Sequence, residues 1–191
     1  MAHEVEPGYV RSARYTLTRP NDTTPYSIGD ALANSSTASA VVPIEFKVAK
    51  ENGGAGFVTG AQLLTDSATA FGAIRLHLFN RAPFAAAAYT ADNSAIAITY
   101  AASRVGIADQ AIDGDNISPH NVPNKLPLID FTTFTAQSSS AMSIGQCDQT
   151  ELAFTCAPNS KLIYGLLEVR AAFTPVALQN FVPMLYVRGI S

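Results

Sequence analysis

The loop at residues 109–116 holds the densest group of metal-type ligands in the sequence. Asp109, Asp113, Asp115 and Asn116 stand close together around Gly114, and carboxylate and amide oxygens are the ligands that Ca²⁺ prefers. The spacing differs from an EF-hand loop, because no Glu follows at the position that binds the ion through both oxygens. A polar turn held by side-chain hydrogen bonds explains the same residues. We expect such a turn and no bound metal, with Ca²⁺ binding as the open alternative.

A second group consists of four glycines, Gly53, Gly54, Gly56 and Gly60. Glycine-rich loops bind phosphate when they open a helix and a Lys follows at a fixed position. Neither a helical pattern nor such a Lys follows here. We therefore interpret these glycines as a hairpin connection after a strand that ends at Lys50.

Catalysis would require a histidine or a carboxylate pair with partners in reach. His77 shares the polar face of an expected strand with Arg75, and we interpret it as a solvated or interface histidine. His3 and His120 fall in segments expected to be flexible or looped, where the sequence places no triad or metal partner beside them. Most acidic residues are isolated in turns, so no acid and base pair stands out. The sequence predicts that the protein is not an enzyme and binds no cofactor.

The two cysteines, Cys147 and Cys156, flank a short stretch that is able to form a hairpin, so a disulfide between them is conceivable. The first residues, Met1 to Arg11, do not resemble a secretory signal, and disulfides are rare outside oxidising compartments. We therefore expect two free or buried thiols.

The composition predicts a surface that is unusually poor in charge. Charged residues make up 14% of the 191 residues and hydrophobic ones 48%, against roughly 25% charged in a typical soluble domain. Such a surface suits a protein whose flanks are covered by neighbours. The net charge of −3 and the lack of a basic cluster interleaved with aromatics argue against nucleic-acid binding. No apolar run reaches the roughly 18 residues of a membrane span.

Alternation of apolar and polar residues predicts strands along most of the chain. It is clearest in Val41–Lys50, where Val42, Ile44, Phe46 and Val48 share a face, and in Phe71–Asn80, where Ile74, Leu76 and Leu78 do. Weaker patterns predict strands over 11–19, 57–65, 95–100, 126–134, 151–156, 161–173 and 181–188. Pro183 cannot donate to a ladder and predicts an edge strand or a bulge.

About eight or nine strands with long polar connections favour an all-β, antiparallel, jelly-roll-like β-sandwich with an N-terminal arm and long loops. Only residues 82–89 and 175–180 leave room for short helical turns. We expect an N-terminal arm and first strand over 1–25, and a single jelly-roll domain over 26–191.

Some side chains are candidates for an interface with another protein chain. The arm 1–9 and the loop 21–34 have little alternation, and extended segments can add to a partner's sheet or lie in its grooves. Tyr and Arg are favoured at interfaces, although core packing is the favoured explanation for the aromatics. The candidates are His3, Glu4, Val5, Tyr9, Tyr26, Arg75 and Phe79.

Four stretches resemble small structural proteins of tailed double-stranded DNA phages. Residues 41–83 read VVPIEFKVAKENGGAGFVTGAQLLTDSATAFGAIRLHLFNRAP, and residues 91–101 read ADNSAIAITYA. YSIGDALAN (26–34) looks like the opening segment of those proteins, and YGLLEVRAAFTPVALQNFVPMLYV (164–187) is similar to their closing strands. The likeness spans most of the chain after about residue 24.

The resemblance implies a capsid decoration or cement protein. Such proteins bind the outside of an HK97-fold capsid as dimers or trimers, and the expected partner is the major capsid protein. The expected role is to bridge neighbouring capsid subunits on the exterior of a virion that is assembled in the host cytoplasm. The alternative is a carbohydrate- or receptor-binding β-sandwich of the virion or tail, against which the absence of Trp counts.

Overall fold

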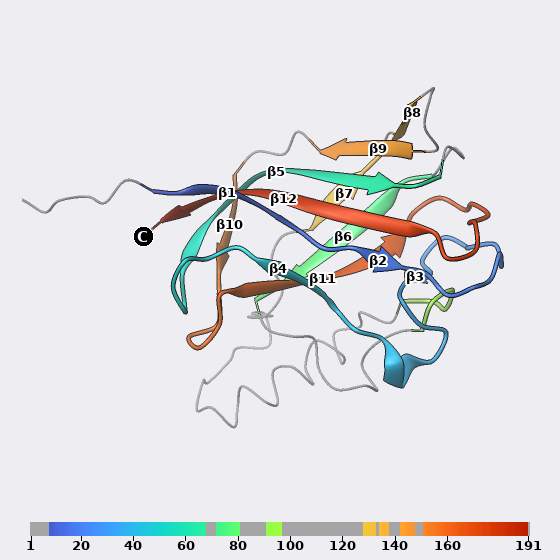
Figure 1. Ribbon diagram of the computed structural model, residues 1–191, viewed down its shortest axis with the longest axis horizontal. Helices are drawn as coiled ribbons and strands as arrows, with labels where there is room; N and C mark the ends of the chain where they lie inside the picture. Colours follow the sequence, from blue (N-terminus) through green and yellow to red (C-terminus); the bar gives the residue numbers. More distant parts are fainter. Residues whose placement is uncertain are drawn as a thin grey trace, which may run out of the picture.

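The computed structural model describes residues 8–67, 72–80, 91–96, 128–132, 134–137, 142–147 and 151–190. They form two antiparallel sheets that pack on each other (Figure 1). The helical content of these residues is one short 3-10 turn, Ala38–Ala40. The expected all-β sandwich is confirmed.

The first sheet has seven strands in the order β1-β12-β5-β9-β8, with β2 beside β12 and β10 beside β5. The bounds of these strands are β1 Val10–Arg14, β2 Leu17–Thr18, β5 Ala55–Thr65, β8 Phe134–Gln137, β9 Met142–Cys147, β10 Leu152–Thr155 and β12 Asn180–Ile190. The second sheet has five strands in the order β3-β11-β6-β7, with β4 also beside β11. Their bounds are β3 Ala31–Leu32, β4 Ile44–Lys47, β6 Ile74–Phe79, β7 Ile129–Phe131 and β11 Leu162–Val169.

The strand pairs are nested along the chain. The first strands, β1 and β2, pair with the last, β12, and the next, β3 and β4, pair with β11. Further inward, β5 pairs with β9 and β10, and β6 pairs with β7. A long antiparallel hairpin that is rolled into two sheets has this order, so the sandwich is a jelly roll.

The core lies between the sheets and is built by alternation. On β12 the side chains of Phe181, Pro183, Leu185 and Val187 are buried, while Val182, Met184 and Tyr186, which alternate with them, are half-buried. On β6, Ile74 and Leu76 are fully buried in the same interior. Burying one such side chain contributes about 1.5–3 kcal/mol, so the interior supplies most of the stability of the fold.

His77 corrects one prediction. Its side chain was expected to be solvated or at an interface, because it alternates with Ile74, Leu76 and Leu78 along the strand. Instead it is only 5% exposed and lies 2.7 Å from Glu168 on the neighbouring strand β11. The pattern identified the face correctly, and the carboxylate on that face offsets the cost of burying the imidazole.

The position of Pro183 corrects a second prediction. It was expected in an edge strand or at a bulge, yet β12 lies between β1 and β5. β1 ends opposite Met184 and β2 begins opposite Phe181, so Pro183 faces the break between them. Its carbonyl accepts from the N–H of Tyr15 in that break. The N and the C=O of one strand residue point the same way, so the missing N–H costs no ladder bond.

The four glycines correct a third. A hairpin was expected after Lys50, but β4 pairs with β11 in the second sheet and β5 with β12 in the first. The glycine segment is therefore a crossover between sheets. Gly53 takes a positive φ of 72° there, which favours glycine.

Some expectations fall on residues outside those that the structure describes. These are the arm residues His3, Glu4 and Val5, the short helix at 82–89, the strand residues 97–100, His120 and the loop 109–116. The proposed boundary at residue 25 also stays a prediction.

Candidate interaction surfaces

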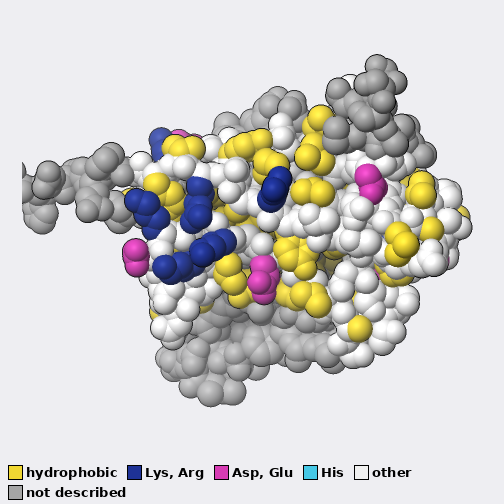
Figure 2. All heavy atoms as spheres, in the orientation of Figure 1, with side chains coloured by type: hydrophobic (Ala, Val, Ile, Leu, Met, Phe, Trp, Pro, Cys, Tyr) yellow, Lys and Arg dark blue, Asp and Glu magenta, His cyan; other side chains and the backbone are white. Residues whose placement is uncertain are grey.

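The outer face of the first sheet is open to solvent. It carries the side chains of β12 that alternate with the buried ones, among them the half-buried Met184 and Tyr186. Val10 on β1 is 78% exposed and Ile190 on β12 is 54% exposed. Hydrophobic side chains spread over the view in which β12 and β5 run across the molecule (Figure 2). A partner that covers this face would remove apolar surface from water.

The outer face of the second sheet is buried within the chain around β6, whereas Glu45 and Lys47 on β4 are exposed. His77 and Phe79 are 5% and 6% exposed, although they point away from the core that Leu76 and Leu78 enter. Glu168, which pairs with His77, also accepts a hydrogen bond of 2.8 Å from Arg170. Burial alone would raise the pKa of Glu168, but the bonds from Arg170 and His77 hold it below its usual value. The two faces of the sandwich therefore differ.

Arg75 lies on the same strand as His77 and is bound to the neighbouring strand. Its Nε and one terminal nitrogen donate to the two carboxylate oxygens of Asp130, at 2.7 and 2.9 Å. The two residues are direct partners across β6 and β7. The hydrogen bonds from Arg75 lower the pKa of Asp130. This fork geometry fixes the β7 edge of the second sheet.

Tyr9 and Arg11 attach the beginning of the chain to the crossover between the sheets. The Tyr9 hydroxyl donates to the carbonyl of Val48 at 2.9 Å and accepts from the backbone N–H of Lys50 at 3.2 Å. Arg11 donates to the carbonyl of Ala49 at 3.1 Å. The N–H of Gly189 donates to the carbonyl of Tyr9. The point at which residues 1–7 join the sandwich is therefore fixed.

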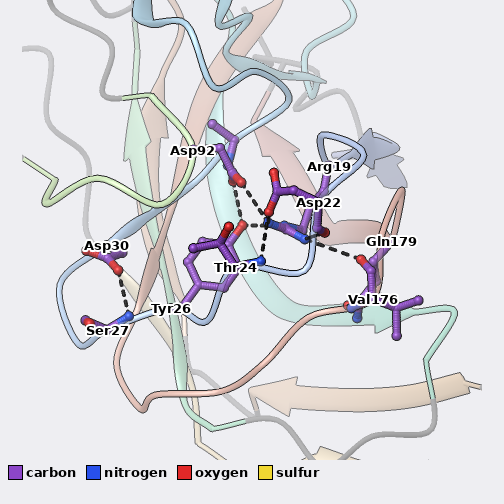
Figure 3. A network of polar contacts seen from close by, with 10 residues as sticks. Arg19, Asp22, Thr24, Tyr26, Ser27, Asp30, Asp92, Val176 and Gln179 are labelled. Carbon is purple, nitrogen blue, oxygen red and sulfur yellow. Dashed lines mark hydrogen bonds and ion pairs between the residues drawn. The ribbon is translucent and has the colours of Figure 1, made fainter.

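Arg19, Tyr26 and Asp92 form a buried polar network at one end of the sandwich (Figure 3). The Arg19 Nε donates to the Tyr26 hydroxyl, which in turn donates to Asp92 Oδ1 at 2.5 Å. Another nitrogen of Arg19 binds Asp92 Oδ2 at 2.9 Å, and the N–H of Ala33 donates to Asp92 Oδ1 at 2.8 Å. Burial raises the pKa of Tyr26, so its hydroxyl stays a neutral donor to Asp92.

The network of Arg19, Tyr26 and Asp92 fixes the position of residues 21–34, which were expected to form a loop. Arg19 also reaches the carbonyls of Asp22 and Val176, at 3.1 and 3.3 Å. Residues 91–96 join the same assembly through bridges to the β2–β3 connection, with Ala95 opposite Asp30. Because these polar groups bond to one another, the network holds two connections in place and presents no open binding site.

The expected interface residues are not gathered into one site. Tyr9 lies beside β1, Tyr26 belongs to the buried polar network, and Arg75 and Phe79 lie on β6. Tyr26 and Phe79 are 2% and 6% exposed, so their rings pack inside this chain.

Arg19 and Asp92 were not predicted from the sequence. Seventy-three positions separate them in the chain, and an Arg at the end of an alternating strand looks like an ordinary exposed residue. Asp92 carried a weak signal, because it belongs to the Ala-Asp-Asn turn. Only the folded structure shows that Arg19 and Asp92 interact, because it brings both side chains to Tyr26.

Cys156 is a free, buried thiol, and burial raises its pKa to about 11. Within the described part of the chain, no group of three or more His, Cys, Asp or Glu residues is placed to hold a metal ion. No helix in that part is both long enough and apolar enough to cross a membrane.

Comparison with known proteins gives little. No protein-family model matches the chain, and no curated protein does. Among solved structures, the capsid asymmetric unit of the cyanophage Pam1 is similar at a TM-score of 0.35 and 14% identity, covering 100% of this chain and 91% of that chain. A likeness at that level carries no argument about role, so the function has to be inferred from the residues of this chain.

Proposed function

We propose that this protein is a structural, non-enzymatic virion component that decorates an HK97-fold phage capsid and bridges neighbouring major capsid subunits. The observation that carries the proposal is the difference between the two faces of the sandwich. Around β6 the second sheet buries its outer side chains within the chain, whereas the first sheet leaves apolar side chains of β1 and β12 open to solvent, with basic residues toward β1. The sequence resemblance to phage structural proteins names the kind of partner.

The open face is suited to lie against a protein surface. On β12 its outward side chains include Val182, Met184 and Tyr186, with Arg188 as the charged member. Tyr and Met contribute large contact areas at interfaces, and on β12 only Arg188 would bring a charge into such a contact. A protein that binds only assembled subunits stabilises the assembly by mass action.

The test is co-sedimentation with expanded capsids of the phage that encodes this chain. Val10→Glu/Ile190→Glu places two charges on the open face at exposed positions. We expect the amount bound at fixed concentration to fall by about tenfold or more, because each buried charge would have to be desolvated.

The matched control is Val176→Glu/Leu178→Glu, which changes two exposed apolar residues outside the sheets. This variant should bind as the parent does. Equal binding by both variants would contradict the use of this face, and absence of the protein from purified virions would contradict the proposed function as a whole.

A further inference from the structure

The cations of the described residues divide into two groups. Arg19, Arg75, Arg170 and Arg188 each bind a carboxylate. The remaining ones have no carboxylate within ion-pair distance among the described residues, and they are Arg11, Arg14, Lys47, Lys50 and Lys161.

These five unpaired cations belong to one region, which we call the basic edge. Arg11 and Arg14 lie on β1, and Lys47 ends β4. Lys50 follows in the crossover, where its ammonium lies 5.5 Å from the Tyr9 ring centroid. The carbonyl of Lys161 accepts from the N–H groups of Val48 and Ala49 in the same crossover. Lys and Arg side chains gather over β1 and β4 (Figure 2).

The basic edge is positively charged, although the chain as a whole is negatively charged. The chain as a whole has a net charge of −3, yet the acidic residues in the elements that form this edge are only Glu45 and Glu51. β1 is also an edge strand, with β12 on one side and no strand on the other among the described residues. An open strand flanked by unpaired cations is suited to an extended acidic segment, which adds backbone bonds and ion pairs together.

The sequence contains such a segment in residues 1–7. MAHEVEP carries Glu4 and Glu6 and no Lys or Arg. In an extended chain these two carboxylates would share one side, about 7 Å apart. His3 and Val5 would take the other side.

Gly8 joins this segment to β1. A Cβ at Gly8 would lie 2.6 Å from the carbonyl oxygen of Gly189, so Gly8 passes close alongside β12. Gly8 therefore continues β1 beside the end of β12, and an extended segment that followed this line would run beyond the open side of its own β1.

We propose that residues 1–7 of one copy bind the basic edge of a second copy, with Glu4 and Glu6 paired to the cations of β1, β4 and the crossover. This inference deepens the proposed function, on which it rests, by assigning the contact between decorating copies. Reciprocal exchange of two arms would close a dimer, and exchange in one direction around an axis would close a ring.

Zero-length carbodiimide coupling joins a carboxylate to an amine that it touches. A mixture of unlabelled and ¹⁵N-labelled protein should give peptides that join Glu4 or Glu6 to Lys47, Lys50 or Lys161, half of them with one light and one heavy partner. Links found only within one label, or no such links, would overturn the proposal.

Sedimentation velocity measures the strength of the association. Glu4→Gln/Glu6→Gln should weaken self-association by about tenfold, since exposed ion pairs are individually weak and several are lost together. Asp22→Asn/Asp66→Asn removes the same charge from positions outside the arm and the basic edge, and should leave self-association unchanged. Equal effects of the two variants would also overturn the proposal.

Charge reversal makes the test specific. Lys47→Glu/Lys50→Glu and Glu4→Lys/Glu6→Lys should each self-associate weakly, and a mixture of the two should recover association. Failure to recover contradicts the pairing. Capsid binding that still depends on Val10 and Ile190 in these variants would leave the proposed function intact while the arm contact fails.

Discussion

Asp92 is the residue at which separate segments of the chain meet. Its carboxylate accepts hydrogen bonds from Arg19, Tyr26 and the backbone of Ala33. Asp92 and Arg19 are both buried, with side-chain exposures of 1% and 0%. A charge in such a place depends on its partner.

Asp92→Asn should therefore be strongly destabilising. Loss of the carboxylate leaves the Arg19 guanidinium buried with only the more exposed Asp22 as a charged partner, and breaking a buried pair costs about 3–5 kcal/mol. Urea denaturation would measure the loss. Asp22→Asn is the matched control: its carboxylate is 35% exposed, and the expected loss is within about 1 kcal/mol. Similar losses of stability for the two variants would contradict the proposed dependence of Arg19 on Asp92.

Asp130 gives the fold a dependence on acid. Because Arg75 lowers its pKa in the folded state, the pair contributes stability above the ordinary Asp pKa of about 4, and this is lost as pH falls through the lowered value. Asp130→Asn should melt below the parent at pH 7, and the difference in Tm should shrink toward pH 2. Calorimetry at several pH values would show it; a constant difference would contradict the pairing.

Cys156 should react slowly in the folded protein. Its thiol is buried and its pKa is raised to about 11, so little thiolate is present at pH 8. In Cys147→Ser, which leaves one thiol, a disulfide reagent should modify the native protein far more slowly than the urea-unfolded protein. Equal rates would show that the Cys156 site is open.

At the scale of elements, two glycines of β5 provide a matched comparison. A Cβ at Gly56 would lie 2.4 Å from the carbonyl oxygen of Arg188 on β12, whereas one at Gly60 would lie 3.6 Å from the Tyr186 ring. Gly56→Ala should push β5 from β12 and cost about 1–3 kcal/mol. Gly60→Ala should be neutral or stabilise by up to about 1 kcal/mol. Chemical denaturation distinguishes them, and an unchanged Gly56→Ala would contradict the close approach.

Alternation was enough to predict the strands whose two faces differ. It located β6 and β11 within longer expected stretches, and it identified the buried side of β4, except that Val42 precedes the pairing with β11 and is 48% exposed. It could not say which sheet a strand joins, because alternation reports a face and not a neighbour. The glycines before β5 and Pro183 in β12 were misjudged for that reason. For the open outer face of the first sheet, the only sequence signal was the low content of charged residues.

At the scale of the whole molecule, the sandwich has one face that is covered around β6 and one face that is open along β12. If the open face lies against a capsid, Met184 becomes shielded, whereas it is half-buried in the free chain. Peroxide should oxidise Met184 several-fold more slowly in virion-bound protein than in free protein. The same rate in both would place the contact elsewhere on the molecule.

The nested pairing also decides when this chain can become folded during synthesis. β12 joins β1, β2 and β5, which precede it by more than a hundred residues. The early strands of the first sheet must therefore wait on the ribosome, with their apolar sides uncovered, until residues 180–190 emerge. Sheets with such distant pairing fold slowly and are open to aggregation meanwhile. A chain paused before residue 180 should be protease-sensitive throughout the first sheet.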